Sequence, residues 1–116
     1  MTAYALAHLF PQAPLHDDVF TYIERIQDTM DPFGGRFLVH GTDAEVIEGP
    51  FEGGYVLIEF PDMEKARAWY ASDAYRAILA MRTDNMRGTT VLLPGVPPDY
   101  DAAATGRAMR AAQAAG

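Results

Sequence analysis

The sequence predicts an α+β fold in which two strand–helix–strand units share one antiparallel sheet. Three observations lead to this prediction. Apolar residues alternate with a period of two in several short stretches, as in strands, and recur every three or four residues between them, as in helices. Proline, glycine and aspartate mark most of the boundaries. The resulting order, strand, helix, strand, strand, helix, strand, is that of a ferredoxin-like βαββαβ sandwich with its helices on one face.

The first predicted strand covers residues 3–10, followed by a helix. Small alanines alternate in the strand with larger side chains, which places the two sets on opposite faces. The larger set is Tyr4, Leu6, His8 and Phe10. Prolines end the strand, and Asp17 and Asp18 favour a helix start. A stripe spaced by three or four residues then predicts a helix that Asp31 and Pro32 end. The stripe is Val19, Tyr22, Ile23, Ile26 and Met30.

The second predicted strand runs from Arg36 to His40 after the glycine pair at 34–35. It is interrupted at residues 41–43 and resumes at residues 45–47, where either a bulge or a tight hairpin would explain the break. A turn-rich segment, residues 48–54, then leads to the third predicted strand.

The second half repeats the pattern of the first. Residues 55–60 form the third predicted strand, Asp62 caps a helix that carries Trp69, and Ser72 caps a further helix. That helix places Tyr75, Ile78, Leu79 and Arg82 on neighbouring turns. Residues 89–93, rich in β-branched and apolar side chains, are the last predicted strand.

Residues 1–95 are therefore predicted to form one ferredoxin-like domain. Residues 96–116 are predicted to be a proline-containing linker and an alanine-rich extension. Two alternatives remain for the extension: a peripheral helix that packs on a partner chain, or a frayed tail.

Charge and composition limit the possible partners. The net charge of −7 and the single lysine argue against nucleic acid as a partner, because phosphate binding needs clustered Lys and Arg. Without cysteine there is no disulfide framework or thiolate site. The N-terminus lacks a basic signal-peptide region, and no apolar run approaches the roughly 20 residues that span a bilayer. We therefore expect a cytoplasmic protein that does not bind membranes.

Three stretches together resemble one known family: Gly-Gly-Arg-Phe-Leu-Val-His-Gly at 34–41, Ile-Glu-Phe-Pro at 58–61, and Ala-Arg-Ala-Trp-Tyr-Ala-Ser-Asp-Ala-Tyr at 66–75. They resemble the domain of unknown function 1330 family of bacterial proteins, over roughly residues 4–95. The resemblance implies a homodimeric α/β barrel, in which the sheets of two chains close over a shared interior. The wider superfamily includes cofactor-independent monooxygenases, polyketide cyclases, muconolactone-isomerase-like enzymes and haem-dependent chlorite-dismutase-like proteins, so the fold does not fix the chemistry.

The candidate site residues follow from which face of the sheet the helices cover. If the helices cover the face of Val56, Ile58 and Phe60, the opposite face lines the barrel interior. We expect a carboxylate, an arginine and two imidazoles to converge there as catalytic groups, namely Glu59, Arg36, His40 and His8. In this hypothesis His40 or His8 is the general base, Glu59 orients it, and Arg36 or Arg82 stabilises an oxyanion. The candidate ligand-binding residues are Tyr4, Tyr55, Tyr75 and Arg82.

Each candidate also has a structural interpretation. Glu59 and Arg36 would form an ion pair across adjacent strands, His8 would sit at the dimer seam, and Trp69 with its neighbouring tyrosines would be core packing. His8, His40 and Glu59 also have the ligand types of a metal site, but their spacing is not diagnostic, and no metal site is predicted.

The leading hypothesis is a homodimeric small-molecule enzyme that uses acid/base chemistry in a barrel pocket. It would resemble a monooxygenase, cyclase or isomerase and would have no tightly bound organic cofactor. The alternative is a non-catalytic homodimer that binds a small organic ligand or has a structural role, since no diagnostic catalytic motif is present.

Overall fold

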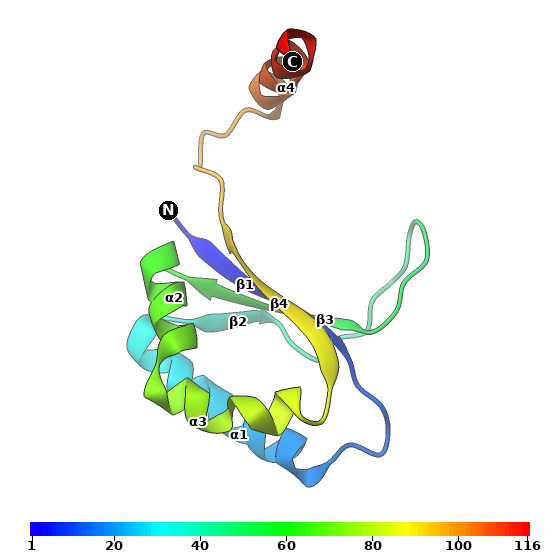
Figure 1. Cartoon of the computed structure of the whole chain (residues 1–116), viewed down its shortest axis with the longest axis vertical. Coiled ribbons are helices and arrows are strands. Elements are labelled where there is room, and N and C mark those ends of the chain that lie inside the picture. The colour runs from blue at the N-terminus through cyan, green and yellow to red at the C-terminus, as the bar shows by residue number, and fades with distance from the viewer.

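Four antiparallel strands form a single sheet in the order β2–β3–β1–β4 (Figure 1). The computed structural model describes residues 1–116. The strands are β1 (Ala3–Phe10), β2 (Arg36–Val39), β3 (Gly54–Phe60) and β4 (Arg87–Pro94). The first and second strands are separated by the third, as the ferredoxin-like order requires, so the predicted fold class is confirmed.

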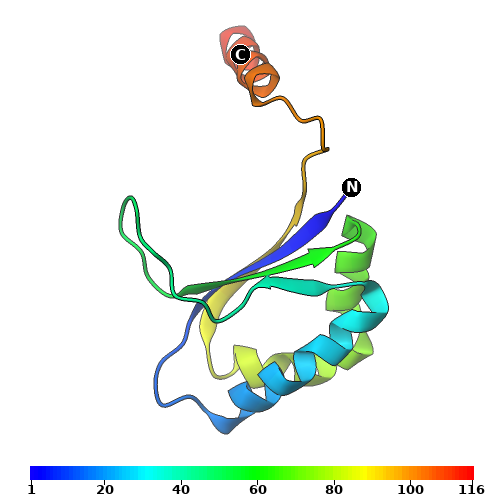
Figure 2. The ribbon, with the colours of Figure 1, turned by 180° about the vertical axis from the view of Figure 1, so that it is seen from behind.

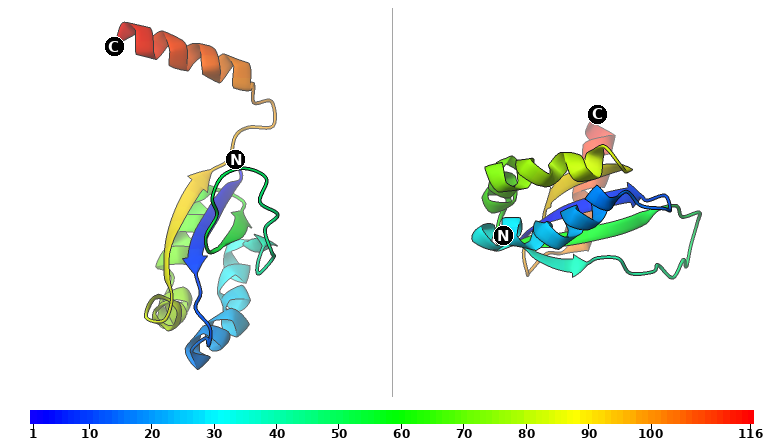
Figure 3. Two further views of the ribbon diagram at one scale, coloured as in Figure 1. Left: turned by 90° about the vertical axis from the view of Figure 1, so that its right-hand side faces the viewer. Right: turned by 90° about the horizontal axis from the view of Figure 1, so that it is seen from below.

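All helices of this domain lie on one face of the sheet (Figures 1 and 2). They are α1 (Asp17–Met30), the short 3₁₀ helix η1 (Asp31–Phe33), α2 (Met63–Ala71) and α3 (Asp73–Thr83). The second helical segment is broken in two at Ser72, whose extended backbone (φ −66°, ψ 148°) ends α2 and begins α3. The other face of the sheet is left without helices, as Figure 3 shows.

The strand β1 separates small from large side chains. Ala3 and Ala5 are buried under the helices, where their size lets α1 and α2 approach the sheet. From β3, Ile58 and Phe60 point to the same side and complete the sheet's contribution to the core. The predicted assignment of the small alanines and of the Val56–Phe60 set to the helix side is therefore confirmed.

Trp69 is the centre of the helical part of the core. Its ring lies 5.3 Å from that of Phe60 and 4.2 Å from that of Tyr75, measured between centroids. Its indole Nε1 donates to Thr29 Oγ1 at 3.0 Å, which satisfies the one polar atom of a fully buried side chain. The contact ties α2 to α1.

The predicted continuation of the second strand at residues 45–47 is wrong. The strand β2 ends at Val39, and residues 41–53 form a long exposed loop. Gly41 and Gly49 adopt positive φ angles of 70° and 76°, which interrupt an extended backbone. The pairing of β2 with β3 shifts register between Phe37 and Val39 and ends at the pair Val39–Leu57, so residues 45–47 are not part of the sheet.

A separate helix, α4 (Ala102–Ala115), follows the domain. Gly95 N donates to Thr2 O at 2.7 Å, which fixes the start of the linker beside the first residues of the chain. Beyond it the linker leads away from the sheet, and α4 stands clear of the other helices (Figure 3). None of the helices is both long and apolar enough to cross a membrane.

Candidate functional site

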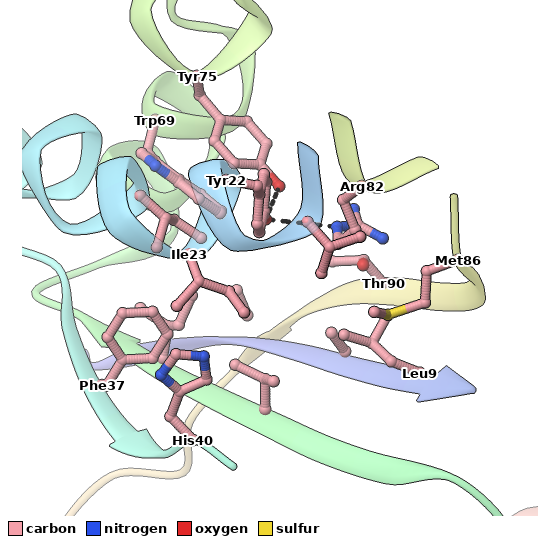
Figure 4. Close-up of a pocket in the computed structure, with 16 residues that line it drawn as sticks. Leu9, Tyr22, Ile23, Phe37, His40, Trp69, Tyr75, Arg82, Met86 and Thr90 are labelled. Carbon is pink, nitrogen blue, oxygen red and sulfur yellow. Dashed lines mark hydrogen bonds between the residues drawn. The ribbon is translucent and has the colours of Figure 1, made fainter. Parts of the chain in front are cut away.

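A cavity lies between the sheet and the helices α1 and α3 (Figure 4). The volume in which the centre of a water-sized sphere fits is about 80 Å³, and the cavity is partly open to solvent. Most of its 16 lining residues are apolar. They are Ala5, Ala7, Leu9, Val19, Tyr22, Ile23, Ile26, Phe37, His40, Val56, Ile58, Trp69, Tyr75, Arg82, Met86 and Thr90. An apolar pocket with a few convergent polar groups is the usual form of a small-molecule site.

The convergent polar groups are Tyr22, Tyr75 and Arg82. The hydroxyls of Tyr22 and Tyr75 are 2.7 Å apart, and Arg82 Nε donates to the Tyr22 hydroxyl at 3.3 Å. Tyr75 lies in the first turn of α3 and Arg82 lies seven residues further on, two helical turns along the same face. Tyr22 comes from the core-facing stripe of α1. The helices α1 and α3 therefore bring these side chains together from distant parts of the chain.

Arg82 is the unusual member of this group, because only 7% of its surface is exposed. Burial would lower the pKa of Arg82, but the Tyr22 and Tyr75 hydroxyls beside it raise that pKa above the ordinary value for arginine. The guanidinium is therefore charged at physiological pH. Burial, together with Tyr75, raises the pKa of Tyr22 well above the ordinary value for tyrosine, even though Arg82 opposes this shift. Tyr22 keeps its proton.

The side chains of Tyr22, Tyr75 and Arg82 have more hydrogen-bond donors than the protein has acceptors for them. One of the two tyrosine hydroxyls donates its hydrogen to the other. The hydrogen of the second hydroxyl then has no acceptor in the hydrogen bonds of these residues. The guanidinium has five N–H groups, and the two tyrosine hydroxyls beside it can accept only some of them. This end of the cavity therefore offers positive charge and free donors to a ligand oxygen.

The opposite end of the cavity is formed by His40 and Phe37, whose rings stack with centroids 4.3 Å apart and planes at 11° (Figure 4). His40 is exposed, as is Ile23 of α1, whereas the other lining residues are at least partly buried. We take this as the mouth of the cavity. An imidazole here can reach both solvent and the interior.

His40 does not share a face with Arg36, and that prediction is wrong. Without an irregularity, residues 36, 38 and 40 would point to one side of the sheet. The register shift in β2 pairs Val39, rather than residue 38, with Leu57. This displacement by one residue turns His40 to the helix side.

Arg36 and Glu59 lie on the open face of the sheet, outside the cavity. Arg36 Nε donates to Glu59 Oε1 at 2.9 Å across the neighbouring strands β2 and β3. The arginine side chain is 68% exposed, so the pair contributes little to stability. The structural interpretation of this pair as a cross-strand ion pair agrees with this geometry, and the predicted convergence of Glu59, Arg36 and His40 in one pocket does not.

His8, Tyr4 and Tyr55 lie on the same open face. His8 stacks on Tyr55, with ring centroids 4.5 Å apart, and its Nε2 donates to the backbone carbonyl of Glu52 at 2.8 Å. Because a carbonyl oxygen only accepts, this bond places the proton on Nε2 and fastens the loop 41–53 to β1. None of the three lines the cavity.

Of the eight predicted site residues, three meet in the cavity: His40, Tyr75 and Arg82. His8 and Glu59 are separated from His40 by the sheet, and no group of three His, Asp or Glu side chains lies close enough to hold a metal ion. His16 caps α1, with its Nδ1 accepting from Asp18 N, and lies outside the cavity.

Sequence reasoning missed Tyr22 as a site residue. Its helical spacing predicts a core position, which is correct, but nothing in that spacing shows that its hydroxyl meets Tyr75. The sequence predicts a core position for Trp69, and the structure shows that Trp69 also forms part of the cavity wall.

Comparisons with known proteins extend these observations. The model of a family described as "Domain of unknown function (DUF1330)" matches residues 2–96. A search of functionally curated proteins gives no match.

Several solved structures have a similar fold. A protein of unknown function from Rhodopseudomonas palustris is 16% identical, covers 84% of each chain and gives a TM-score of 0.61. A dimeric ferredoxin-like protein of unknown function from Thermobifida fusca is 18% identical, with 82% of this chain and 92% of that chain covered and a TM-score of 0.56. SnoaB from Streptomyces nogalater, described as a cofactor-independent oxygenase, is 13% identical, with 86% and 96% covered and a TM-score of 0.50. At these identities the similarity establishes the fold alone.

Proposed function

This chain belongs to the DUF1330 family, and from this premise we propose that it is a homodimeric small-molecule enzyme that removes a proton from an aromatic or enolic substrate. The reaction takes place in the cavity between the sheet and the helices, rather than in the barrel interior. It needs no tightly bound organic cofactor, and the similarity in fold to SnoaB is compatible with such chemistry.

The observation that carries this proposal is the buried Tyr22–Tyr75–Arg82 trio at the closed end of an apolar cavity. A charged guanidinium is expensive to bury unless an anion or a strong acceptor offsets the cost. No carboxylate of the chain pairs with Arg82. A bound substrate oxygen with negative charge supplies the missing partner.

The roles of the residues follow from the two ends of the cavity. Apolar side chains along the walls, with the face of Trp69, suit a planar aromatic ring. His40 at the mouth is the general base that takes a proton from an acidic O–H or C–H group. The negative charge that develops moves to the substrate oxygen, where Arg82 and a tyrosine hydroxyl stabilise it by hydrogen bonds in a site shielded from water.

The residues of the open face have a different role in this proposal. Val91, Leu93 and Tyr55 are each about two-fifths exposed and lie on the face without helices, together with Tyr4 and Leu6. Such an apolar surface is typical of an interface. Packing against the same face of a second chain would bury it, and one solved structure with a similar fold is described as dimeric.

Benzoylacetone is a suitable probe of the proposed chemistry, because it combines an aromatic ring with an acidic C–H group between two carbonyls. We expect the protein to accelerate exchange of this hydrogen in D₂O, measured by proton NMR against buffer alone. Binding is followed separately through the fluorescence of Trp69, the only tryptophan and part of the cavity wall.

Two variants separate the roles. His40→Ala should slow the exchange by about 10²-fold or more while the dissociation constant changes little. Arg82→Met should weaken binding about tenfold or more, the loss expected for a hydrogen bond to a charged group. Arg36→Met, on the other face of the sheet, is the matched control and should leave both quantities unchanged.

The alternative function is non-catalytic binding of the same class of ligand. It is favoured if benzoylacetone quenches the fluorescence of Trp69 and the exchange rate stays at the buffer value. If neither binding nor exchange depends on Arg82 or His40, the proposed site is wrong.

A further inference from the structure

Two exposed segments of the chain carry opposite charge. The loop 41–53 contains four carboxylates and neither lysine nor arginine: Asp43, Glu45, Glu48 and Glu52. The helix α4 contains two of the nine basic residues, Arg107 and Arg110, and no carboxylate. Arg107 lies 3.8 Å from Asp101 of its own chain, but both side chains are mostly exposed, and such a pair is easily exchanged for another.

Both segments also expose apolar side chains that nothing in the chain covers. Ile47 is 90% exposed and Val46 is 54% exposed, which are high values for residues of this type. Met109 of α4 is 68% exposed, on the side of the helix away from Arg107 and Arg110. Along one side of α4 the remaining residues are small, so another backbone can approach closely. These residues are Ala103, Gly106, Ala111 and Ala114.

The topology keeps the two segments apart within one chain. The loop is fastened at the His8 end of β1, where Gly54 pairs with Leu9. The linker to α4 starts at the other end of the strand, where Gly95 bonds to Thr2. These ends are about 20 Å apart. The linker has seven residues before α4 and contains a turn at residues 98–99, where Tyr100 N donates to Pro97 O at 3.0 Å. It leads away from the sheet, and α4 lies clear of the loop (Figure 3).

We propose that α4 of one chain docks on the loop 41–53 of a second copy. The inference rests on the proposed homodimer. When two sheets face each other with their strands in opposite directions, the end of β4 in one chain lies beside the start of β3 in the other, which is where the loop joins the sheet. Arg107 and Arg110 then meet the loop carboxylates, and the small residues on the same side of α4 lie against Ile47. Because a two-fold interface is self-complementary, each dimer has two such contacts.

The absence of native cysteine allows a direct test. The variants Ile47→Cys and Ala114→Cys, the second on the same side of α4 as the two arginines, are prepared separately, mixed to allow subunit exchange, and oxidised. We expect a disulfide between the two variants, seen as a band of twice the chain mass on a non-reducing gel. A mixture of Ile47→Cys with Phe20→Cys, an exposed position on α1, is the matched control and should give little product.

Charge reversal tests the recognition. In the mixture, adding Arg107→Glu and Arg110→Glu to the Ala114→Cys chain should lower the rate of disulfide formation about fivefold, the effect of losing two exposed ion pairs. Adding Glu45→Lys and Glu48→Lys to the Ile47→Cys chain should restore it.

Light scattering on the unmodified chain distinguishes failure of this inference from failure of the proposed homodimer. A dimer whose mixed variants form no more disulfide than the control overturns the docking of α4 alone. A monomer overturns both. A double variant that forms its disulfide only within one chain also overturns the proposal, because α4 would then dock on its own domain.

Discussion

Thr29 illustrates how single residues hold the helical layer in place. Its hydroxyl donates to the Ile26 carbonyl at 2.7 Å and accepts from Trp69 Nε1 at 3.0 Å. A threonine inside a helix often bonds to a preceding carbonyl in this way. Here the same oxygen also satisfies the only buried indole, so a small polar side chain on α1 orients the largest side chain of α2.

The first prediction concerns this contact. Thr29→Val keeps the shape of the side chain but removes the acceptor, which leaves a buried N–H without a partner. We expect the free energy of unfolding to fall by about 1–3 kcal/mol, measured by urea denaturation. Thr29→Ser keeps the hydroxyl and is the control. Equal losses in the two variants would show that the hydrogen bond is not the cause.

At the scale of elements, the junction of α2 and α3 at Ser72 connects the core to the cavity. The Ser72 hydroxyl donates to the Trp69 carbonyl at 2.7 Å and accepts from Tyr75 N at 3.3 Å. One side chain thus ends one helix and begins the next. Because Tyr75 lies in the first turn of α3, its hydroxyl position depends on where that helix begins.

The prediction at this scale compares two helix caps. Ser72→Ala should lower the free energy of unfolding by about 1 kcal/mol and also weaken ligand binding, because Tyr75 loses its anchor. Asp62→Ala removes the cap of α2, where Asp62 Oδ1 accepts from Lys65 N at 2.8 Å, and Asp62 does not line the cavity. It should cost similar stability without changing affinity. Titration of Trp69 fluorescence and urea denaturation measure the two quantities, and equal affinities in the two variants would contradict the role of Ser72.

At the scale of the whole molecule, the sheet separates two kinds of surface. One face carries the core and the cavity, and the other carries the apolar residues of the proposed dimer interface together with the Arg36–Glu59 pair. Changes on one face should therefore have little effect on the other, because residues without shared partners act nearly independently.

We accordingly predict that Leu93→Asp converts the dimer to a monomer, because each copy would place a carboxylate in an apolar interface. Light scattering measures the mass. Phe20→Asp, a change of equal chemistry at a residue about half exposed on α1, should leave the dimer intact. A dimeric Leu93→Asp variant would place the interface elsewhere.

The order of the elements could be predicted from the sequence because each has a clear period and clear caps. The alternation of residues 3–10 and of residues 55–60 correctly assigns both faces of β1 and β3. The sequence also predicts Asp62 and Ser72 as the N-terminal caps of two helices, and they cap α2 and α3.

The site was harder to predict, for two physical reasons. A register shift of one residue in β2 changes the face of every residue after it, and the residue types around position 38 do not reveal it. The Tyr22–Tyr75 hydrogen bond joins residues 53 positions apart, and only the packing of α1 on α3 brings them together. Periodicity shows which side of a helix is buried, but it does not show which residues of other elements that side contacts.

The alternation along β1 limits how this protein can change during evolution. Its small residues fit beneath the helices, and its large residues face away from them. Substitutions can adjust either set separately. A single inserted residue would instead exchange the two sets beyond that point, driving Tyr4, Leu6, His8 or Phe10 into the helical layer and leaving alanines on the outside. A length change in this strand preserves the two faces only if it adds or removes an even number of residues, whereas the loop that follows the strand is free of this constraint.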